Sequence, residues 1–193
     1  KLQLIVDNTF SPLQISPIQL GADIVIHSLT KFINGSSDTV GGVTCASKEF
    51  INSLKNVNSG ASMLLGPTMD SMRSASVMKN LRTLHLRIKQ HSHNAAYLAE
   101  KFAQLTEHPL VGAVKTCGFM AGLLLVKNKT TMEHFDANLA VGMICRKHCF
   151  GNGLIMRAVG DRMIIAPPLT MTHEQIDEMM GLIVNALNLT YEE

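Results

Sequence analysis

Four side chains that can do covalent and acid–base chemistry follow two short apolar segments near the start of the chain. They are Asp7, Ser28, Thr30 and Lys31. One amine, one carboxylate and two hydroxyls are the groups that pyridoxal 5′-phosphate (PLP) needs. A lysine forms a Schiff base with its aldehyde, a carboxylate pairs with its protonated pyridine nitrogen, and hydroxyls donate to its phosphate.

These residue types predict one role for each side chain. We expect Lys31 to be the catalytic residue, which forms the Schiff base and later moves protons between substrate carbons. We expect Asp7 to bind the pyridine nitrogen, and Ser28 and Thr30 to bind the phosphate. Taken singly, each has an ordinary explanation, because an aspartate after a strand often closes a turn and a lysine there is usually solvated.

The elements around these residues predict that they meet. The apolar run 2–6 and the segment 22–28 are expected to be strands, joined by a crossover with a short helix near 13–20. Such a β-α-β unit has parallel strands. Asp7 and Ser28 then arrive at the same edge of the sheet, which is where open α/β sheets bind ligands.

The middle of the chain is expected to be helical. A strand over 39–47 and a helix over 48–57 precede one long periodic segment, 67–105. We predict a single continuous helix there, roughly 55–60 Å long at its full extent, which bridges two lobes. Its apolar stripe comprises Leu81, Leu84, Ile88, His91, Ala95, Leu98, Phe102 and Leu105.

The C-terminal part reads as a small α+β domain. Paired strands are expected around Gly118, and the other predicted elements are a helix over 138–153, strands over 154–158 and 163–166, and a final helix. Thr172 and Gln175 predict a capping box at the start of that helix. Its apolar face comprises Ile176, Met179, Met180, Ile183 and Leu187. We therefore divide the chain into 1–66, 67–105 and 106–193.

Composition narrows the class of protein. Of 193 residues, 46% are hydrophobic and 17% are charged, which is enough apolar content for a core. The net charge is +2 and there is no tryptophan, so we expect no nucleic-acid partner. No apolar run reaches about 18 residues, which argues against a membrane span.

The cysteines make no C-x-x-C pair and predict neither a disulfide framework nor a metal site. They are Cys45, Cys117, Cys145 and Cys149. Free thiols suit a reducing compartment, and we expect a cytoplasmic protein. The chain opens directly on an apparent core strand without an initiator methionine, so we also expect sequence upstream of Lys1.

The motif "VDNTF" followed by "LGADIVIHSLTKFINGSSDTVGG" resembles the Cys/Met-metabolism PLP-dependent enzymes, the family of methionine gamma-lyase and cystathionine gamma-synthase. The resemblance runs from residue 1 to about 104. It implies an α/β, fold-type I PLP-dependent transferase (aspartate-aminotransferase-like), with an incomplete large domain plus a small C-terminal α+β domain. It also implies the roles given above to Asp7, Ser28, Thr30 and Lys31.

Residues from about 106 to 193 resemble instead the C-terminal domain of class III (omega-amino acid) aminotransferases. That resemblance matches Arg157 of "LIMRA" to an arginine that binds the substrate carboxylate. The ordinary alternative for Arg157 is a surface or interlobe salt bridge. The chain thus looks like two families joined near residues 105–108.

Three functions follow from these resemblances. The first is carbon–sulfur lyase or transsulfuration chemistry on a small-molecule amino-acid substrate. The second is aminotransferase activity. The third is a non-catalytic chimeric fragment, because the family's phosphate loop and stacking aromatic lie upstream of the aspartate. The resemblance also implies a homo-oligomer, a dimer or a tetramer.

Overall fold

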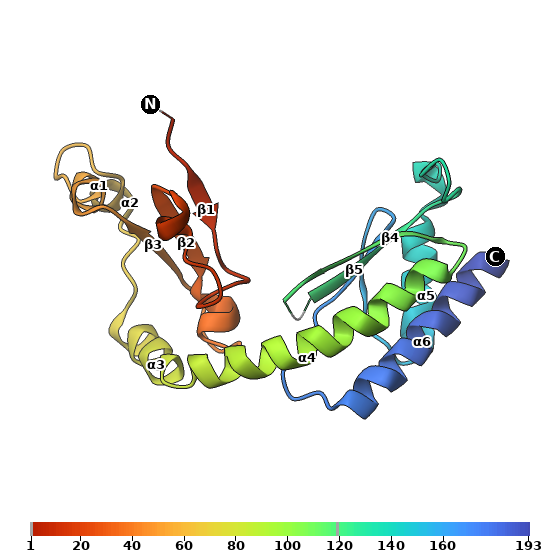
Figure 1. Ribbon diagram of the computed structural model, residues 1–193. Helices are drawn as coiled ribbons and strands as arrows, with labels where there is room; N and C mark the ends of the chain where they lie inside the picture. The colour runs from red at the N-terminus through yellow and green to blue at the C-terminus, as the bar shows by residue number, and fades with distance from the viewer. Residues whose placement is uncertain (1, 119) are drawn as a thin grey trace. The chain divides into compact units, whose positions relative to one another are not determined.

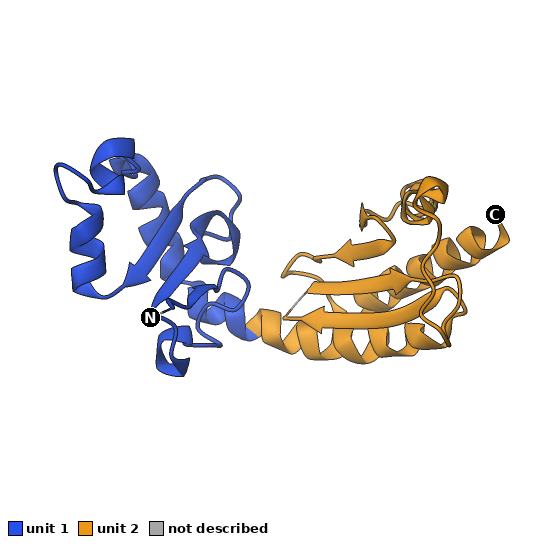
Figure 2. Cartoon of the chain, turned by 90° about the horizontal axis from the view of Figure 1, so that it is seen from above, with its two compact units in different colours: residues 1–89 blue, residues 90–193 orange. Residues whose placement is uncertain are grey.

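The computed structural model describes residues 2–118 and 120–193 (Figure 1). It forms two compact units, residues 1–89 and residues 90–193, coloured separately in Figure 2. Each unit is described by itself. The predicted division at residues 66 and 105 stays a prediction.

Unit 1 contains a three-stranded sheet in the order β1-β2-β3, formed by β1 (Ile5–Asp7), β2 (Ile24–Ser28) and β3 (Gly42–Ala46). The predicted parallel pairing of β1 with β2 is confirmed, with Asp7 opposite Ile26. The third strand is antiparallel to β2 and returns beside it directly from the turn that carries Lys31. An antiparallel neighbour needs no helical crossover, which explains the short connection.

The crossover between β1 and β2 is less regular than predicted. In place of a helix over 13–20 there is one 3-10 turn, Pro17–Leu20, which Gly21 ends with a φ of 100°. Two prolines in this segment, Pro12 and Pro17, lack the N–H groups that a longer helix needs. The chain still returns in the direction that makes the two strands parallel.

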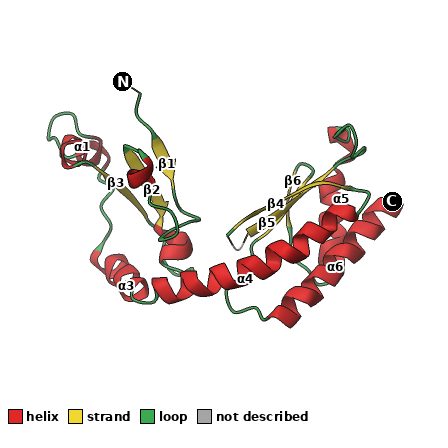
Figure 3. Cartoon of the chain, viewed as in Figure 1, coloured by secondary structure: helices red, strands yellow, loops and turns green. Residues whose placement is uncertain are grey.

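The prediction of one continuous helix over 67–105 is wrong. The segment instead contains α3 (Ser71–Leu81) and α4 (Leu84–Gln104), both labelled in Figure 3. They follow the shorter α1 (Lys48–Leu54) and α2 (Ala61–Leu65). The Asp70 side chain caps α3 by accepting from the Arg73 N–H. Between the two helices the Thr83 hydroxyl donates to the Asn80 carbonyl, a local bond that competes with the helical pattern.

A small apolar core joins the turn after β2 to α3 and the start of α4. Its buried members are Ile33, Val77, Leu84 and Ile88, with Leu29, Phe32 and Met69 packed around them. Two of these residues belong to the stripe predicted for the long helix, so that part of the periodicity is correct although the helix is broken. The core therefore supports the turn that carries Lys31.

Unit 2 contains a four-stranded antiparallel sheet in the order β4-β5-β7-β6. Its strands are β4 (Val111–Cys117), β5 (Met120–Leu125), β6 (Arg157–Val159) and β7 (Arg162–Ile165). Phe119, where the second strand was predicted to start, lies outside the described residues. The predicted pairing around Gly118 is confirmed.

Two helices, α5 (Val141–Gly151) and α6 (His173–Glu192), pack with α4 residues against this sheet. The predicted capping box is confirmed, because Thr172 Oγ1 accepts from the Gln175 N–H and Gln175 Oε1 accepts from the Thr172 N–H. All five residues of the predicted apolar face of α6 are buried. Cys145 and Cys149 are buried free thiols.

Within the described residues, no helix is both long enough and apolar enough to cross a lipid bilayer. Short 3-10 turns also occur at Leu105–Glu107 and Ala137–Leu139.

Candidate functional site

The predicted carboxylate and the first predicted hydroxyl meet at one edge of the sheet in unit 1. Asp7 is the last residue of β1 and Ser28 is the last residue of β2. Thr9 joins them: its N–H donates to Asp7 Oδ1 at 3.0 Å, and its Oγ1 accepts from the Ser28 N–H at 2.7 Å. The carboxyl ends of the two strands are therefore tied together by one buried threonine.

The Asp7 carboxylate is exposed and held in its ionised form. Hydrogen bonds from the Thr9 side chain and then from its N–H lower the pKa of Asp7 below its usual value, and the charge of His27 lowers this pKa further. An ionised carboxylate at a strand end can pair with a cation such as a protonated pyridine nitrogen. Asp7 thus fits the role predicted for it.

Ser28 and Thr30, the two residues predicted to bind the phosphate, differ in whether their hydroxyls already make hydrogen bonds. Ser28 is half-buried, and its hydroxyl makes no hydrogen bond among the residues that the structure describes. Thr30 Oγ1 is already engaged with Gly41, accepting from the N–H at 3.1 Å and donating to the carbonyl at 3.4 Å. The bond to the carbonyl is long, so the Thr30 hydroxyl can turn to another acceptor at small cost.

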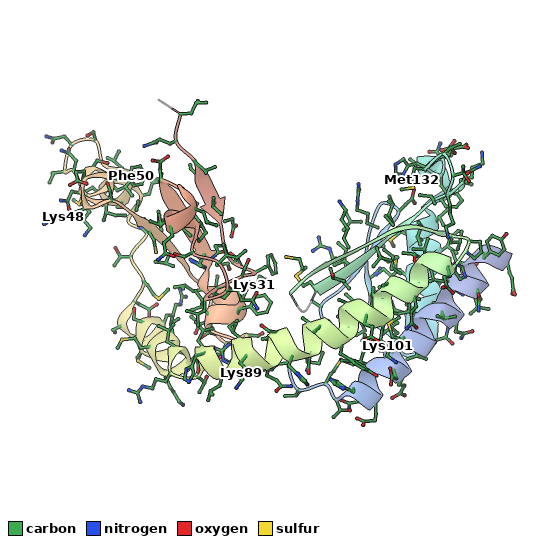
Figure 4. The ribbon with its side chains drawn as sticks, in the orientation of Figure 1. Lys31, Lys48, Phe50, Lys89, Lys101 and Met132 are labelled. Atoms are coloured by element: carbon green, nitrogen blue, oxygen red, sulfur yellow. The ribbon has the colours of Figure 1, made fainter. Side chains whose placement is uncertain are left out.

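Lys31 lies within a π-helical turn, Leu29–Ile33, that follows β2 directly (Figure 4). Its backbone is not helical, with φ of −88° and ψ of −121°. The side chain is exposed, and its ammonium group has no hydrogen-bond or ion-pair partner in the part of the chain that the structure describes. An amine without a carboxylate partner suits a lysine that must react with an aldehyde.

Arg157 lies elsewhere, in unit 2, as the first residue of β6. It is exposed and has no ion pair among the described residues, so the salt bridge considered as its alternative is not seen there. It lines a pocket of about 320 Å³ with Arg146 and Phe150. Asp7, Ser28 and Lys31 thus belong to unit 1, at or just after the carboxyl ends of β1 and β2, whereas Arg157 belongs to unit 2.

Sequence reasoning missed the residues that hold these side chains in place. Thr9 and Gly41 contact the predicted ligands directly, and Arg87 donates to the turn that carries Lys31. The only signal in the sequence is the Asn-Gly pair at 34–35, which is typical of a tight turn. Nothing in the sequence indicates that Arg87, more than fifty residues away, would reach it.

The fold is that of PLP-dependent aminotransferases. A co-factor free transaminase matches 99% of this chain with a TM-score of 0.78 at 21% identity, and the PMP-bound aminotransferase of Vibrio fluvialis matches all of it with a TM-score of 0.77 at 22% identity. The family model for Cys/Met-metabolism PLP-dependent enzymes matches residues 1–149. The chain belongs to this family, and the predicted fold class and cofactor are confirmed at that level.

Curated relatives point to both predicted resemblances. The methionine gamma-lyase of Arabidopsis thaliana is 40% identical over 53% of this chain, and the L-methionine gamma-lyase of Treponema denticola is 35% identical over 89% of it. The putrescine–pyruvate aminotransferase of Pseudomonas aeruginosa is 47% identical over 61% of the chain. The family match extends to residue 149, beyond the limit of about 104 that we predicted.

The chain spans less than half the length of these relatives: 23% of the A. thaliana enzyme, 44% of the T. denticola enzyme and 26% of the P. aeruginosa enzyme. The matched solved structures are covered to 47% and 44%. The chain therefore carries one part of a fold-type I architecture.

The donor set in unit 1 fits PLP. It offers an ionised carboxylate at Asp7, a free hydroxyl at Ser28 and an unpaired amine at Lys31, all beside the carboxyl ends of parallel strands. When bound, PLP supplies an electron sink for the carbon next to the substrate amine.

Proposed function

We propose that this chain carries the lysine half of a PLP site used for carbon–sulfur lyase or transsulfuration chemistry on a sulfur-containing amino acid. The observation that carries the proposal is the unpaired amine of Lys31 in the turn after β2, the strand that pairs in parallel with β1, which ends at the ionised Asp7. The methionine gamma-lyase relatives supply the reaction class.

The protein's own groups would divide the work as follows. Lys31 holds the cofactor covalently and then takes a proton from the substrate as a general base. Asp7 keeps its charge because Thr9 donates to it, and so holds a proton on the pyridine nitrogen. Ser28 donates its free hydroxyl to the phosphate, and Thr30 adds a second donor after turning from Gly41.

A second candidate is amino transfer, favoured by the relative that is a putrescine–pyruvate aminotransferase. In that reading Arg157, beside Arg146 in the pocket of unit 2, binds a substrate carboxylate. A third candidate is a non-catalytic chimeric chain, favoured by its similarity to relatives of both kinds. Homo-oligomer formation and a cytoplasmic location remain predictions.

The first experiment locates the reactive lysine. The protein is incubated with PLP and reduced with borohydride, and the labelled peptide is identified by mass spectrometry. We expect the label on Lys31, no label in Lys31→Ala, and full labelling in Lys48→Ala, the control at an exposed lysine in the same unit (Figure 4). A label that stays in Lys31→Ala contradicts the assignment.

The second experiment separates the three candidate functions. Release of a 2-oxo acid and a thiol from methionine indicates the lyase, whereas amino transfer from putrescine to pyruvate indicates the aminotransferase. A folded chain that takes the Lys31 label but turns over neither substrate supports the non-catalytic reading. Size-exclusion chromatography with light scattering, carried out with and without PLP, tests the oligomer.

A further inference from the structure

The turn that carries Lys31 ends on carbonyl groups that its own backbone does not pair. A helical segment leaves its last carbonyls without partners. Here the Arg87 guanidinium supplies the missing donors. Its Nη1 donates to the Phe32 carbonyl, and its Nη2 donates to the Ile33 carbonyl at 2.8 Å. One guanidinium thus bridges two successive carbonyls, a geometry that its planar fork of donors allows and a lysine cannot reproduce.

Arg87 is itself fixed in place. Its Nε donates to Thr83 Oγ1 at 3.2 Å, and Nη2 also reaches the Asn80 carbonyl at 3.2 Å. The next residue, Ile88, is buried in the same core as Ile33. No carboxylate pairs with Arg87 within residues 2–118 and 120–193, so its charge is balanced by carbonyl dipoles.

A second set of contacts holds the end of the turn. The Asn34 side chain is 1% exposed, and its Nδ2 donates to Asp38 Oδ1 at 2.7 Å. Asn80 Nδ2 donates to Asn34 Oδ1 at 2.9 Å. A Cβ at Gly35 would lie 2.3 Å from Arg87 Nη1, so the glycine makes room for the guanidinium.

We propose that Arg87 is a positioning residue that fixes the turn and so sets the direction from which Lys31 presents its amine to the cofactor. The proposal rests on the proposed function of Lys31. Lys31 has a non-helical backbone, and the turn keeps two backbone hydrogen bonds of its own, from Asn34 N–H to Leu29 O and from Gly35 N–H to Lys31 O. The bridge from Arg87 prevents this irregular turn from relaxing.

The test compares Arg87→Met, which keeps an unbranched apolar stem and loses every donor, with Arg87→Lys, which keeps the charge. Arg82→Met is the matched control, because Arg82 is an exposed arginine whose side chain makes no hydrogen bond or ion pair among the described residues. Amide hydrogen exchange in the cofactor-free protein is read at Asn34 and Gly35, and at Val25 of β2 as the reference for unfolding of the whole unit.

We expect exchange at Asn34 and Gly35 to speed up by about tenfold in Arg87→Met and by less in Arg87→Lys, because charge-assisted hydrogen bonds are lost. Val25 should change little. The affinity with which Lys31 attaches PLP should fall by about tenfold in Arg87→Met. The visible circular dichroism per bound cofactor should also fall, since this signal reports how rigidly the cofactor is oriented in the protein. Arg82→Met should match the wild type in all three measurements.

Equal acceleration at Val25 would mean that Arg87 only stabilises unit 1, and this would overturn the proposal. Unchanged exchange and dichroism in Arg87→Met would overturn it as well. If Arg87→Met does not fold, the comparison of Arg87→Lys with Arg82→Met decides in the same way. A wild-type protein that takes no label at Lys31 refutes the proposed function instead, and the exchange rates then still show whether the bridge holds the turn.

Discussion

Thr9→Val is the sharpest test of the sheet edge that positions Asp7 and Ser28. The Thr9 side chain is almost fully buried, and its hydroxyl is the acceptor for the Ser28 N–H at 2.7 Å. Valine has nearly the same shape but no oxygen. The substitution therefore removes the bond between the two strand ends and leaves the packing almost unchanged.

The expected cost follows from the lost acceptor. A backbone N–H left without a partner costs about 1–3 kcal/mol when it is buried. Ser28 is only half-buried, so we place the loss in the free energy of unfolding of unit 1 at about 1–2 kcal/mol. The pKa of Asp7 should rise toward its ordinary value, because the Thr9 hydroxyl is the largest contributor to its lowering.

The assay has to report on unit 1. Both tyrosines, Tyr97 and Tyr191, lie in unit 2 and the chain has no tryptophan, so fluorescence is unsuitable. Amide exchange at Val25 measures the stability, and an NMR titration measures the pKa of Asp7. Thr9→Ser, which keeps the hydroxyl, should retain a low pKa at Asp7. A Thr9→Val protein with wild-type exchange and a wild-type Asp7 pKa would refute the reasoning.

Three further predictions concern separate parts of the chain. Gly35→Ala should lower the fraction of protein that borohydride labels with PLP by about tenfold or more. The φ of 74° at Gly35 and the nearby Arg87 both exclude a side chain. Phe102→Ala should destabilise unit 2 by about 3–5 kcal/mol in urea unfolding followed by tyrosine fluorescence, since Phe102 is fully buried in its core. Hydrogen bonds from Lys101 and then Tyr97 lower the pKa of Asp177. This carboxylate should therefore stabilise the fold above pH about 4 and lose that effect as the pH falls through its lowered pKa, and Asp177→Asn should flatten acid unfolding curves in that range.

The sequence indicated most of the regular elements for reasons that act locally. Apolar runs predicted β1 and β2, and the order strand–crossover–strand predicted their parallel pairing. The capping box at Thr172 was visible because its partner lies three residues away. The prediction of one long helix was wrong because the apolar periodicity continues across residues 82–83. There the helix is interrupted, and the Thr83 hydroxyl donates to the Asn80 carbonyl.

For the candidate site, the sequence by itself determined which groups are present and at which strand ends they stand. Residue type sets chemistry, and the point where an apolar run stops sets where a strand ends, so Asp7, Ser28 and Lys31 could be named without coordinates. Only the tertiary structure decided that the Thr30 hydroxyl is occupied by Gly41 and that Arg87 holds the turn. Those contacts depend on how distant segments pack, and a pairing across fifty residues leaves no periodic trace in the chain.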